Sequence, residues 1–411
     1  MKAILKPPFT PKSDVLLTIG GSKSESNRLL ILQALYSNIR IENLSDSDDS
    51  KVLIDGLQVS NGTVDVGHAG TAMRFLTAYF ACLEHADIVL TGSSRMQERP
   101  IGILVDALRQ LGAEIEYLKT KGYPPLRIKG KTLRENKVKL EASVSSQFIS
   151  ALMLIAPKLP HGIHIALEGE IASRPYIEMT LGLLQKAGVE AHFKNNEIVV
   201  SPASEIPDTT FYVESDWSSL SYFYSLIALS EGAELRCSYF REDSLQGDRD
   251  LAFFYEGLGV STFFEDDHTV LLRKNNLMLP EEAFFDLSGS PDLAQTIAVT
   301  CFGLGMGCSL EGLQTLKIKE TDRLLALKTE LEKLGAEVSV TDDSLHLEKA
   351  TQMIAGVAID TYQDHRMAMA FAPLGVKIPI EINDAEVVSK SFPNFWTDMK
   401  RVGLVCELSR F

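Results

Sequence analysis

Residues 108–115 read LRQLGAEI, and similar phrases return at 184–191 (LQKAGVEA), 255–260 (YEGLGV) and 331–338 (LEKLGAEV). Each phrase joins the end of an amphipathic helix to a glycine that suits a helix C-cap, and a strand-forming segment follows at once. The glycines lie about 70 to 76 residues apart, and residues 53–57 form a weaker copy. This spacing predicts an internal repeat of a mixed α/β unit.

Short strand-like segments complete these repeats, for example at 126–128, 198–200 and 345–347. A β-α-β-α-β-β unit used about six times, three per domain, accounts for the length of 411 residues. A chain of this length exceeds what one hydrophobic core usually supports, so two α/β domains are expected. The domain boundary is expected near residues 213–219, where a strand passes into a Ser-capped helix.

The composition restricts the kinds of partner. The net charge of −15 argues against nucleic acid or an anionic membrane surface, since neither attracts an acidic protein. No run reaches the roughly 20 apolar residues that span a bilayer, and residues 1–8 cannot form a signal-peptide core. The five cysteines are odd in number, show no Cys-x-x-Cys pair and lie mostly in apolar runs. We therefore expect a cytoplasmic protein with buried thiols.

An anion-binding junction is predicted at residues 20–28, which read GGSKSESNR. An apolar strand at 14–19 ends at the two glycines, and a helix follows. Backbone N–H groups and the helix dipole favour a phosphate or carboxylate there by roughly 0.3–1 kcal/mol. Lys23 and Arg28 would add charge-assisted hydrogen bonds. The alternative is an ordinary Ser-capped helix with a solvated Lys and Arg; the segment is not a Walker loop.

Six further segments place polar residues where strands give way to helices or loops: 67–74, 95–100, 143–148, 317–323, 364–369 and 389–393. In an acidic protein, these mostly basic junctions suggest one anion-binding pocket shared by both halves of the chain. Each segment alone also has a structural explanation, such as a surface charge pair with Glu98, an N-cap at Ser145 or a salt-bridged helical turn at 319–323. No metal-type spacing supports His365 as a ligand.

Taken together, six motifs resemble those of the 3-phosphoshikimate 1-carboxyvinyltransferase (EPSP synthase) family in the same order: 21–28, 69–74, 95–100, 145–147, 319–323 and 364–368. The resemblance covers essentially the whole chain. It implies an α/β fold of two inside-out α/β barrel domains with three β-α-β-α-β-β units each. It places the N-terminal domain at 21–215, the C-terminal domain at 1–20 and 216–411, and the active site in the cleft between them.

The resemblance also implies a reaction. The enolpyruvyl group of phosphoenolpyruvate is transferred to the 5-hydroxyl of shikimate 3-phosphate, and phosphate is released, as a step toward chorismate and the aromatic amino acids. The implied partners are these two small molecules, without nucleic acid or membrane. No metal or organic cofactor is expected, and the protein is expected to be a monomer.

Residue roles follow by match to the family's motifs. For shikimate 3-phosphate the match gives Lys23, Ser24, Arg28, Ser145, Ser146, Gln147, Ser173, Tyr176, Asp292 and Lys319. For phosphoenolpyruvate it gives Lys23, Gly70, Arg95, Gln147, Arg323, Arg366 and Lys390. The catalytic residues would be Asp292 as general base, Glu320 as proton donor, and Lys23. Without the resemblance, an N-cap at Asp292 and a salt-bridging Glu320 would be the simpler interpretations.

The chain departs from the family pattern at four positions: Gly20 replaces a common proline, His68 a frequent asparagine, Phe75 a frequent proline, and Thr315 an asparagine that often binds the sugar. His68 and Phe75 flank the phosphoenolpyruvate loop and bear on the response to glyphosate.

Two alternatives remain. UDP-N-acetylglucosamine enolpyruvyl transferase shares the fold, but the reactive cysteine typical of its loop is absent from residues 92–100. A non-catalytic phospho-ligand binding protein would gain nothing from the carboxylates of Asp292 and Glu320.

Overall fold

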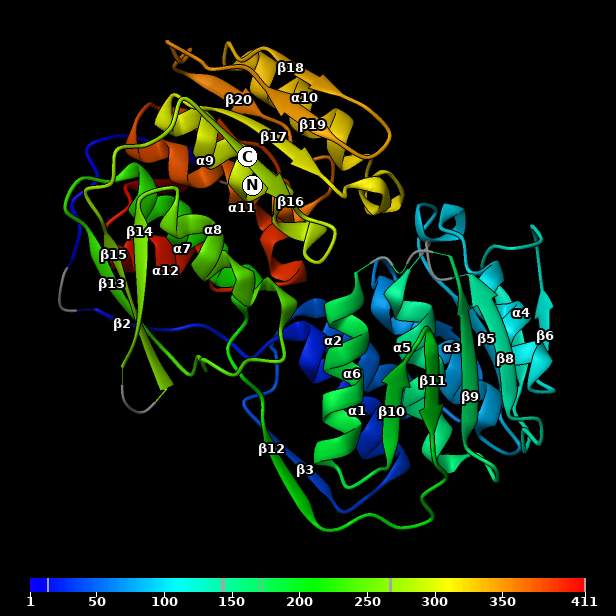
Figure 1. The fold of residues 1–411 in the computed structure, drawn as a ribbon. Helices are drawn as coiled ribbons and strands as arrows, with labels where there is room; N and C mark the ends of the chain where they lie inside the picture. The colour runs from blue at the N-terminus through cyan, green and yellow to red at the C-terminus, as the bar shows by residue number, and fades with distance from the viewer. Residues whose placement is uncertain (13–14, 142–144, 170, 172, 266–267, 410–411) are drawn as a thin grey trace. The chain divides into compact units, whose positions relative to one another are not determined.

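The computed structural model describes residues 1–411 except 13–14, 142–144, 170, 172, 266–267 and 410–411 (Figure 1). The chain divides into two compact units, one of residues 21–213 and the other of residues 1–20 and 214–411. No helix among the described residues is long and apolar enough to cross a membrane.

The 21–213 unit contains the predicted repeat. One copy is β4 (Asn61–Asp65), α3 (Gly70–Cys82), β5 (Asp87–Thr91), α4 (Gly102–Gln110), β6 (Glu114–Tyr117) and β7 (Leu126–Lys129). The next is β8 (Lys137–Glu141), α5 (Ser146–Ile155), β9 (Ile163–Glu168), α6 (Arg174–Lys186), β10 (Ala191–Lys194) and β11 (Glu197–Val200). A shorter copy consists of α1 (Lys23–Leu35), β3 (Ile39–Glu42) and α2 (Asp48–Leu57), with β12 (Thr209–Tyr212) parallel to β3.

The other unit repeats the same order. Its first copy contains β2 (Leu16–Thr18), α7 (Trp217–Leu229), β13 (Glu234–Ser238), α8 (Leu251–Glu256), β14 (Val260–Glu265) and β15 (Thr269–Lys274). The second contains β16 (Glu282–Asp286), α9 (Ala294–Leu304), β17 (Gly307–Glu311), α10 (Arg323–Lys333), β18 (Val338–Val340) and β19 (Leu345–Leu347). The third contains β20 (Val357–Ile359), α11 (His365–Phe371), β21 (Ile380–Ile382), α12 (Phe395–Val402) and β22 (Cys406–Ser409), and β1 (Lys2–Leu5) completes its sheet.

Within the described residues, the four-stranded sheets share one topology. In the order β4-β5-β7-β6, for example, β4 and β5 are parallel and the other pairs are antiparallel. The same pattern returns in β8-β9-β11-β10, β2-β13-β15-β14 and β16-β17-β19-β18, whereas β3 and β12 pair alone. The prediction of a β-α-β-α-β-β repeat is therefore confirmed, with one copy reduced to two strands.

Gly112, Gly188 and Gly335 follow the C-caps of α4, α6 and α10 directly, as predicted, whereas α8 ends at its C-cap Gly257, two residues before Gly259. Gly112, Gly188, Gly259 and Gly335 all have positive φ, between 85° and 98°, a conformation that glycine adopts without strain. The weaker copy at 53–57 is different, because Gly56 lies inside α2. A Cβ there would lie 2.6 Å from Cδ1 of Leu76 in α3, so the Leu76 side chain packs directly against this glycine.

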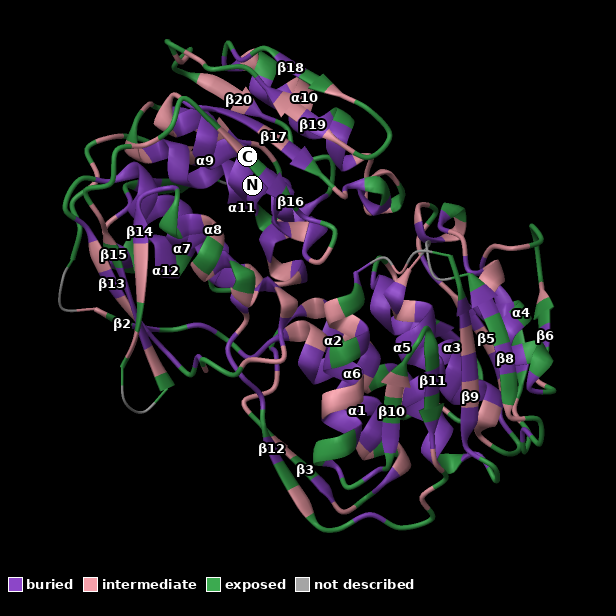
Figure 2. Ribbon diagram, viewed as in Figure 1, coloured by how far each residue is buried: buried purple, intermediate pink, exposed green. Residues whose placement is uncertain are grey.

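The core of each unit is made of helices that are buried on all sides (Figure 2). These are α3 and α5 in the 21–213 unit and α7, α9 and α11 in the other, and nearly all of their residues are buried. A helix that is apolar all round must lie inside the fold. The predicted Ser cap of α7 is wrong, since Asp216 caps it by accepting from the backbone N of Ser219 at 2.7 Å.

The buried helices also pack against one another at their N-terminal ends. Arg366 at the start of α11 bonds to Asp292, just before α9, and to Ser218 at the start of α7. In the 21–213 unit, Gln147 at the start of α5 bonds to Thr71 at the start of α3. Each unit therefore gathers the positive ends of several helix dipoles at one place, and such places favour anions.

Candidate active site

Asp292 lies at the centre of a cluster of cations in the 214–411 unit. Its carboxylate contacts Lys319 at 3.2 Å, Arg323 at 2.9 Å and Arg366 at 3.2 Å. Burial would raise the pKa of Asp292, but the charges of Lys319, Arg366 and Arg323 outweigh burial and hold the pKa well below its usual value. Asp292 lies in the short helix η5 (Pro291–Leu293), whose N-cap is Ser290, so the N-cap interpretation of Asp292 is wrong.

Arg323, one of the cations of this cluster, donates hydrogen bonds to three carboxylates. The first residue of α10, it is only 2% exposed. Its Nε donates to Asp364 at 2.7 Å, its Nη1 to Asp292 at 2.9 Å and its Nη2 to Glu320 at 3.0 Å. Burial lowers the pKa of Arg323, but the carboxylates outweigh it and raise the pKa above its usual value. The guanidinium therefore stays charged and fixes the geometry of the cluster.

Glu320 lies between two cations. It accepts from Arg323 at 3.0 Å and from Lys390 Nζ at 2.9 Å, and its side chain is 14% exposed. Lys390 is buried and ends the short helix η8 (Ala385–Lys390). The salt-bridging interpretation of Glu320 is therefore confirmed. All six candidate residues of this unit, Asp292, Lys319, Glu320, Arg323, Arg366 and Lys390, are joined by these contacts.

Arg28 is the central cation of the 21–213 unit. It is buried in α1 and donates to Thr180 Oγ1 at 2.7 Å, Ser150 Oγ at 3.1 Å and the backbone oxygens of Ser24 and Tyr176 at 2.8 and 3.2 Å. All four of these acceptors are neutral oxygens. Burial lowers the pKa of Arg28 to about 10, against smaller opposing effects of Tyr176 and Glu25. A buried cation held by neutral oxygens is well suited to an anionic ligand.

The starts of α3 and α5 hold four more candidate residues. Gln147 donates its side-chain amide to Thr71 Oγ1 at 3.3 Å, and Ser145 caps α5 by accepting from the backbone N of Gln147. The capping interpretation of Ser145 is thereby confirmed, and Ser146, the first residue of α5, is buried. Gly70 begins α3, and a Cβ there would lie 2.8 Å from the guanidinium of Arg99. Glycine at this position lets that cation lie against the helix start.

The remaining candidates in this unit have different surroundings. Lys23 begins α1 and forms an ion pair with buried Asp49 at 3.5 Å. Ser173 precedes α6 with φ of 53°, and its side chain makes no capping bond. Arg95 pairs with Glu98 at 3.1 Å, and their side chains are 38% and 65% exposed. The surface-pair interpretation of Arg95 therefore describes its contact in this structure.

Several contacting residues were missed by the sequence analysis: Asp49, Ser150, Thr180, Ser218, Asp248 and Asp364. Asp248 bonds to Ser218, and each of the others contacts a cation that the motifs identify. The partners lie far apart in the chain, as with Arg28 and Thr180. No local pattern distinguishes such residues from ordinary buried polar groups. Asp364 alone had a signal, because it stands in the quoted segment 364–369.

The departures from the family pattern also have defined surroundings. The Phe75 ring lies 5.6 Å from the guanidinium carbon of Arg28, so it packs beside that cation. His68 Nδ1 and Ser93 Oγ are hydrogen-bonded at 3.0 Å. The Thr315 hydroxyl is buried and has no hydrogen-bond partner among the described residues.

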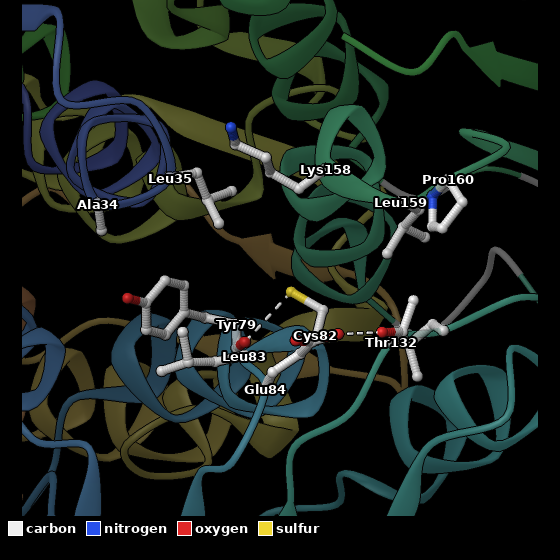
Figure 3. A pocket seen from close by; sticks show the side chains of 11 residues that line it. Ala34, Leu35, Tyr79, Cys82, Leu83, Glu84, Thr132, Lys158, Leu159 and Pro160 are labelled. Carbon is white, nitrogen blue, oxygen red and sulfur yellow. Dashed lines mark hydrogen bonds between the residues drawn. The ribbon is translucent and has the colours of Figure 1, made fainter. Parts of the chain in front are cut away.

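A cavity of about 310 Å³ lies elsewhere in the 21–213 unit (Figure 3). Ala34 and Leu35 at the end of α1 line it, together with Tyr79 and Cys82 near the end of α3. The candidate residues stand at the opposite ends of these helices, each about 20 Å long. Burial raises the pKa of the Cys82 thiol to about 12, so the thiol stays protonated. This cavity is separate from the anion site.

Asp248, which lies next to the cation cluster, is expected to make the stability of the protein depend on pH. It is buried in η3 (Gly247–Asp250) and bonds to Ser218, which in turn accepts from Arg366 at 3.2 Å. Burial raises the pKa of Asp248 to about 6, against the opposing effect of Arg366. Because the folded pKa exceeds the unfolded value, the charged form opposes folding. This penalty is absent below pH 4 and fully present above pH 6.

Asp248→Asn is therefore expected to gain stability relative to the parent as pH rises. Between pH 4.5 and 7.5 the difference in unfolding free energy should move by about 2 kcal/mol in favour of the asparagine variant. Urea unfolding at the two pH values measures it. Exposed Asp243→Asn is the control, expected to show no such change. An equal difference at both pH values would contradict the raised pKa.

Solved structures identify the class of fold. EPSP synthase from Acinetobacter baumannii matches with a TM-score of 0.76 and 20% identity over 100% of this chain and 99% of that one. The enolpyruvyl transferase NikO from Streptomyces tendae matches with a TM-score of 0.73 and 12% identity, over 99% of this chain and 98% of that one. The fold is that of the enolpyruvyl transferases, two domains of repeated β-α-β-α-β-β units, as predicted.

Sequence comparison identifies the family within this class. The family model described as EPSP synthase (3-phosphoshikimate 1-carboxyvinyltransferase) matches residues 56–399. A 3-phosphoshikimate 1-carboxyvinyltransferase of Bacteroides fragilis (strain YCH46) is 44% identical over 410 residues, covering 98% of both chains. The chain belongs to the EPSP synthase family.

Proposed function

We propose that this protein transfers the enolpyruvyl group of phosphoenolpyruvate to the 5-hydroxyl of shikimate 3-phosphate and releases phosphate. One observation supports this most strongly: two carboxylates, Asp292 and Glu320, lie among four cations that contact them directly. A site that only binds anions gains nothing from carboxylates, whereas this reaction needs both a base and an acid.

The cations would bind phosphoenolpyruvate. Its carboxylate and phosphate groups suit the paired N–H donors of Arg323 and Arg366 and the ammonium groups of Lys23 and Lys390. Arg95, Gln147 and Gly70 belong to the same proposed set. These cations would also stabilise the leaving phosphate and the charge that develops in the tetrahedral intermediate.

Shikimate 3-phosphate would be held mainly from the 21–213 unit. The proposed ligands there are Lys23, Ser24, Arg28, Ser145, Ser146, Gln147, Ser173 and Tyr176. Arg28 supports this assignment because it is a buried cation whose four hydrogen-bond acceptors are neutral oxygens. Asp292 and Lys319 complete the set, which therefore draws on residues of both domains.

Proton transfer is the chemical part of the proposal. Asp292 takes the proton of the 5-hydroxyl of shikimate 3-phosphate, and the hydroxyl oxygen then bonds to C2 of phosphoenolpyruvate. Glu320 donates a proton to the C3 methylene of phosphoenolpyruvate. The resulting tetrahedral intermediate then loses a methyl proton and phosphate, which restores the double bond. Each proton-transfer group typically contributes about 10²–10⁴ in rate.

The low pKa of Asp292 links base strength to substrate binding. Lys319, Arg366 and Arg323 stabilise its charged form and make it a weak base. Anionic groups of the substrates would offset these charges, and the pKa of Asp292 would then rise. The base would therefore become effective when both anionic substrates are bound.

The cellular location, the need for a cofactor and the oligomeric state complete the proposal. All five cysteines are free thiols, in keeping with the proposed cytoplasmic location. Carboxylates and cations supply the proton transfer and charge stabilisation that the reaction needs, so the proposal includes no cofactor. A monomer remains the prediction for the oligomeric state.

Phosphate release tests the proposed function directly. The purified protein is expected to release phosphate only when shikimate 3-phosphate and phosphoenolpyruvate are both present. Phosphoenolpyruvate alone and shikimate 3-phosphate alone serve as controls. Turnover with UDP-N-acetylglucosamine, and none with shikimate 3-phosphate, would overturn the assignment in favour of the related transferase.

A further inference from the structure

A strained turn at residues 361–364 brings Asp364 and Arg366 into the cation cluster. The backbone N of Asp364 donates to the backbone O of Thr361 at 2.8 Å and closes the turn. Its two central residues, Tyr362 and Gln363, have φ of 52° and 56°. Glycine and asparagine tolerate this left-handed conformation, but other residues hold it at a cost on the order of 1–3 kcal/mol each. The surrounding structure must therefore support the turn.

Glu330 of α10 provides this support. Its side chain is 0% exposed. Its Oε1 accepts from the Tyr362 hydroxyl at 2.6 Å, and its Oε2 accepts from the backbone N of Asp360 at 3.1 Å and from Lys333 Nζ at 2.8 Å. A buried carboxylate with three donors is well satisfied and has little freedom to move. The carboxylate thus fixes both the turn and the segment before it.

Helix α10 holds the same segment at a second point. Arg323, at the start of α10, donates to Asp364 at 2.7 Å and 3.3 Å. Arg323 and Glu330 stand seven residues apart, about two helical turns, and so lie on one side of α10. Asp364 also accepts from the backbone N of Arg366 at 2.9 Å and caps α11. Two contacts with one rigid helix therefore set where α11 begins.

We propose that Glu330 and Tyr362 are positioning residues for the anion-binding arginines. Their hydrogen bond holds the strained turn, the turn places Asp364, and Asp364 orients Arg323 and the start of α11 with Arg366. This inference rests on the proposed function, because it takes these arginines to bind phosphoenolpyruvate. Tyr362 is 38% exposed, but partial desolvation and the bond to Glu330 raise its pKa to about 12, so the hydroxyl keeps its proton at neutral pH.

Tyr362→Phe tests the proposal because it removes only the hydroxyl. We expect the KM for phosphoenolpyruvate to rise about tenfold, and the KM for shikimate 3-phosphate to stay within about twofold. Adding Gln363→Gly to this variant is expected to restore part of the loss, since glycine adopts positive φ without strain. A purely structural role would lower the melting temperature without this difference between the two substrates.

Tyr224→Phe is the matched control. Its hydroxyl bonds to Thr262 Oγ1 at 2.7 Å in the same unit, but Tyr224 lies in helix α7, whereas Tyr362 lies in the turn before α11. We expect this control to lose stability but keep both KM values. Tyr362→Phe with the parent KM for phosphoenolpyruvate, or an equal rise in the control, would overturn the positioning role.

A binding measurement separates this inference from the proposed function. Inorganic phosphate is expected to raise the melting temperature of the parent and of Tyr224→Phe more than that of Tyr362→Phe. If the parent shows no turnover, the proposed function fails, while the phosphate measurement still decides the positioning role. Equal stabilisation of all three proteins by phosphate would overturn that role.

Discussion

Asp292→Asn is expected to lower kcat by about 10²–10⁴ while the KM for phosphoenolpyruvate stays the same or falls. The amide cannot take a proton from the 5-hydroxyl. The change also removes a negative charge that contacts Lys319, Arg323 and Arg366 at 2.9 to 3.2 Å. These cations would then be more available to an anionic substrate, so binding is preserved or strengthened.

Steady-state kinetics with each substrate varied in turn measures both effects. Asp286→Asn is the matched control, because it is the same chemical change at the end of β16, where the carboxylate is hydrogen-bonded to Ser288. The control is expected to keep kcat within about twofold. A kcat within about threefold of the parent in Asp292→Asn would remove Asp292 from the role of base, whatever the change in KM.

The repeat could be predicted because its signals are local. A helix that ends at a glycine with positive φ and continues as a strand needs only a few consecutive residues, as at Gly112 and Gly335. Gly56 shows the limit of this reading, since packing against Leu76 explains it and no cap does. Gly403, which ends α12 with φ of 115°, was not recognised because its phrase differs from the others.

The candidate site was predictable only in part. The motifs identified the cations and the two carboxylates, because their residue types stand together in sequence. What holds each of them comes from distant segments, such as Thr180 beside Arg28 and Asp364 beside Arg323. The sequence could not show that Asp292 is shared among three cations, and this sharing is what sets its pKa. The residue types of each motif can be recognised in consecutive sequence, but the charges that surround each side chain depend on the fold.

Arg323→Met is expected to destabilise the protein by about 3–5 kcal/mol, the usual cost of removing one partner from a buried ion pair. Arg323 is 2% exposed, and Asp364, its closest partner, is 0% exposed. Methionine fills a similar volume but offers no donors. The carboxylates of Asp364, Asp292 and Glu320 would each lose a charged hydrogen bond, and the burial of Asp364 would then strongly oppose its charge.

Urea unfolding at pH 7.5 measures this loss. Arg273→Met is the matched control, because Arg273 also pairs with a carboxylate, that of Glu234 at 3.0 Å, but its side chain is 51% exposed. We expect the control to lose less than about 1 kcal/mol. Adding Asp364→Asn to Arg323→Met is expected to recover part of the stability, since the double variant no longer buries an uncompensated charge.

The stability difference between Arg323→Met and the parent should change with pH if lost charge interactions cause it, whereas lost packing would give a difference that is independent of pH. In the parent, the low pKa of Asp292 contributes stability above its unfolded pKa, and acid removes that contribution. In Arg323→Met the uncompensated carboxylates would bind protons more tightly when folded, so lowering the pH from 7.5 to 5 is expected to narrow the gap to the parent. A gap that stays constant over this range would mean that Arg323 acts through packing, and the network of buried charges would then not be what orders the cluster.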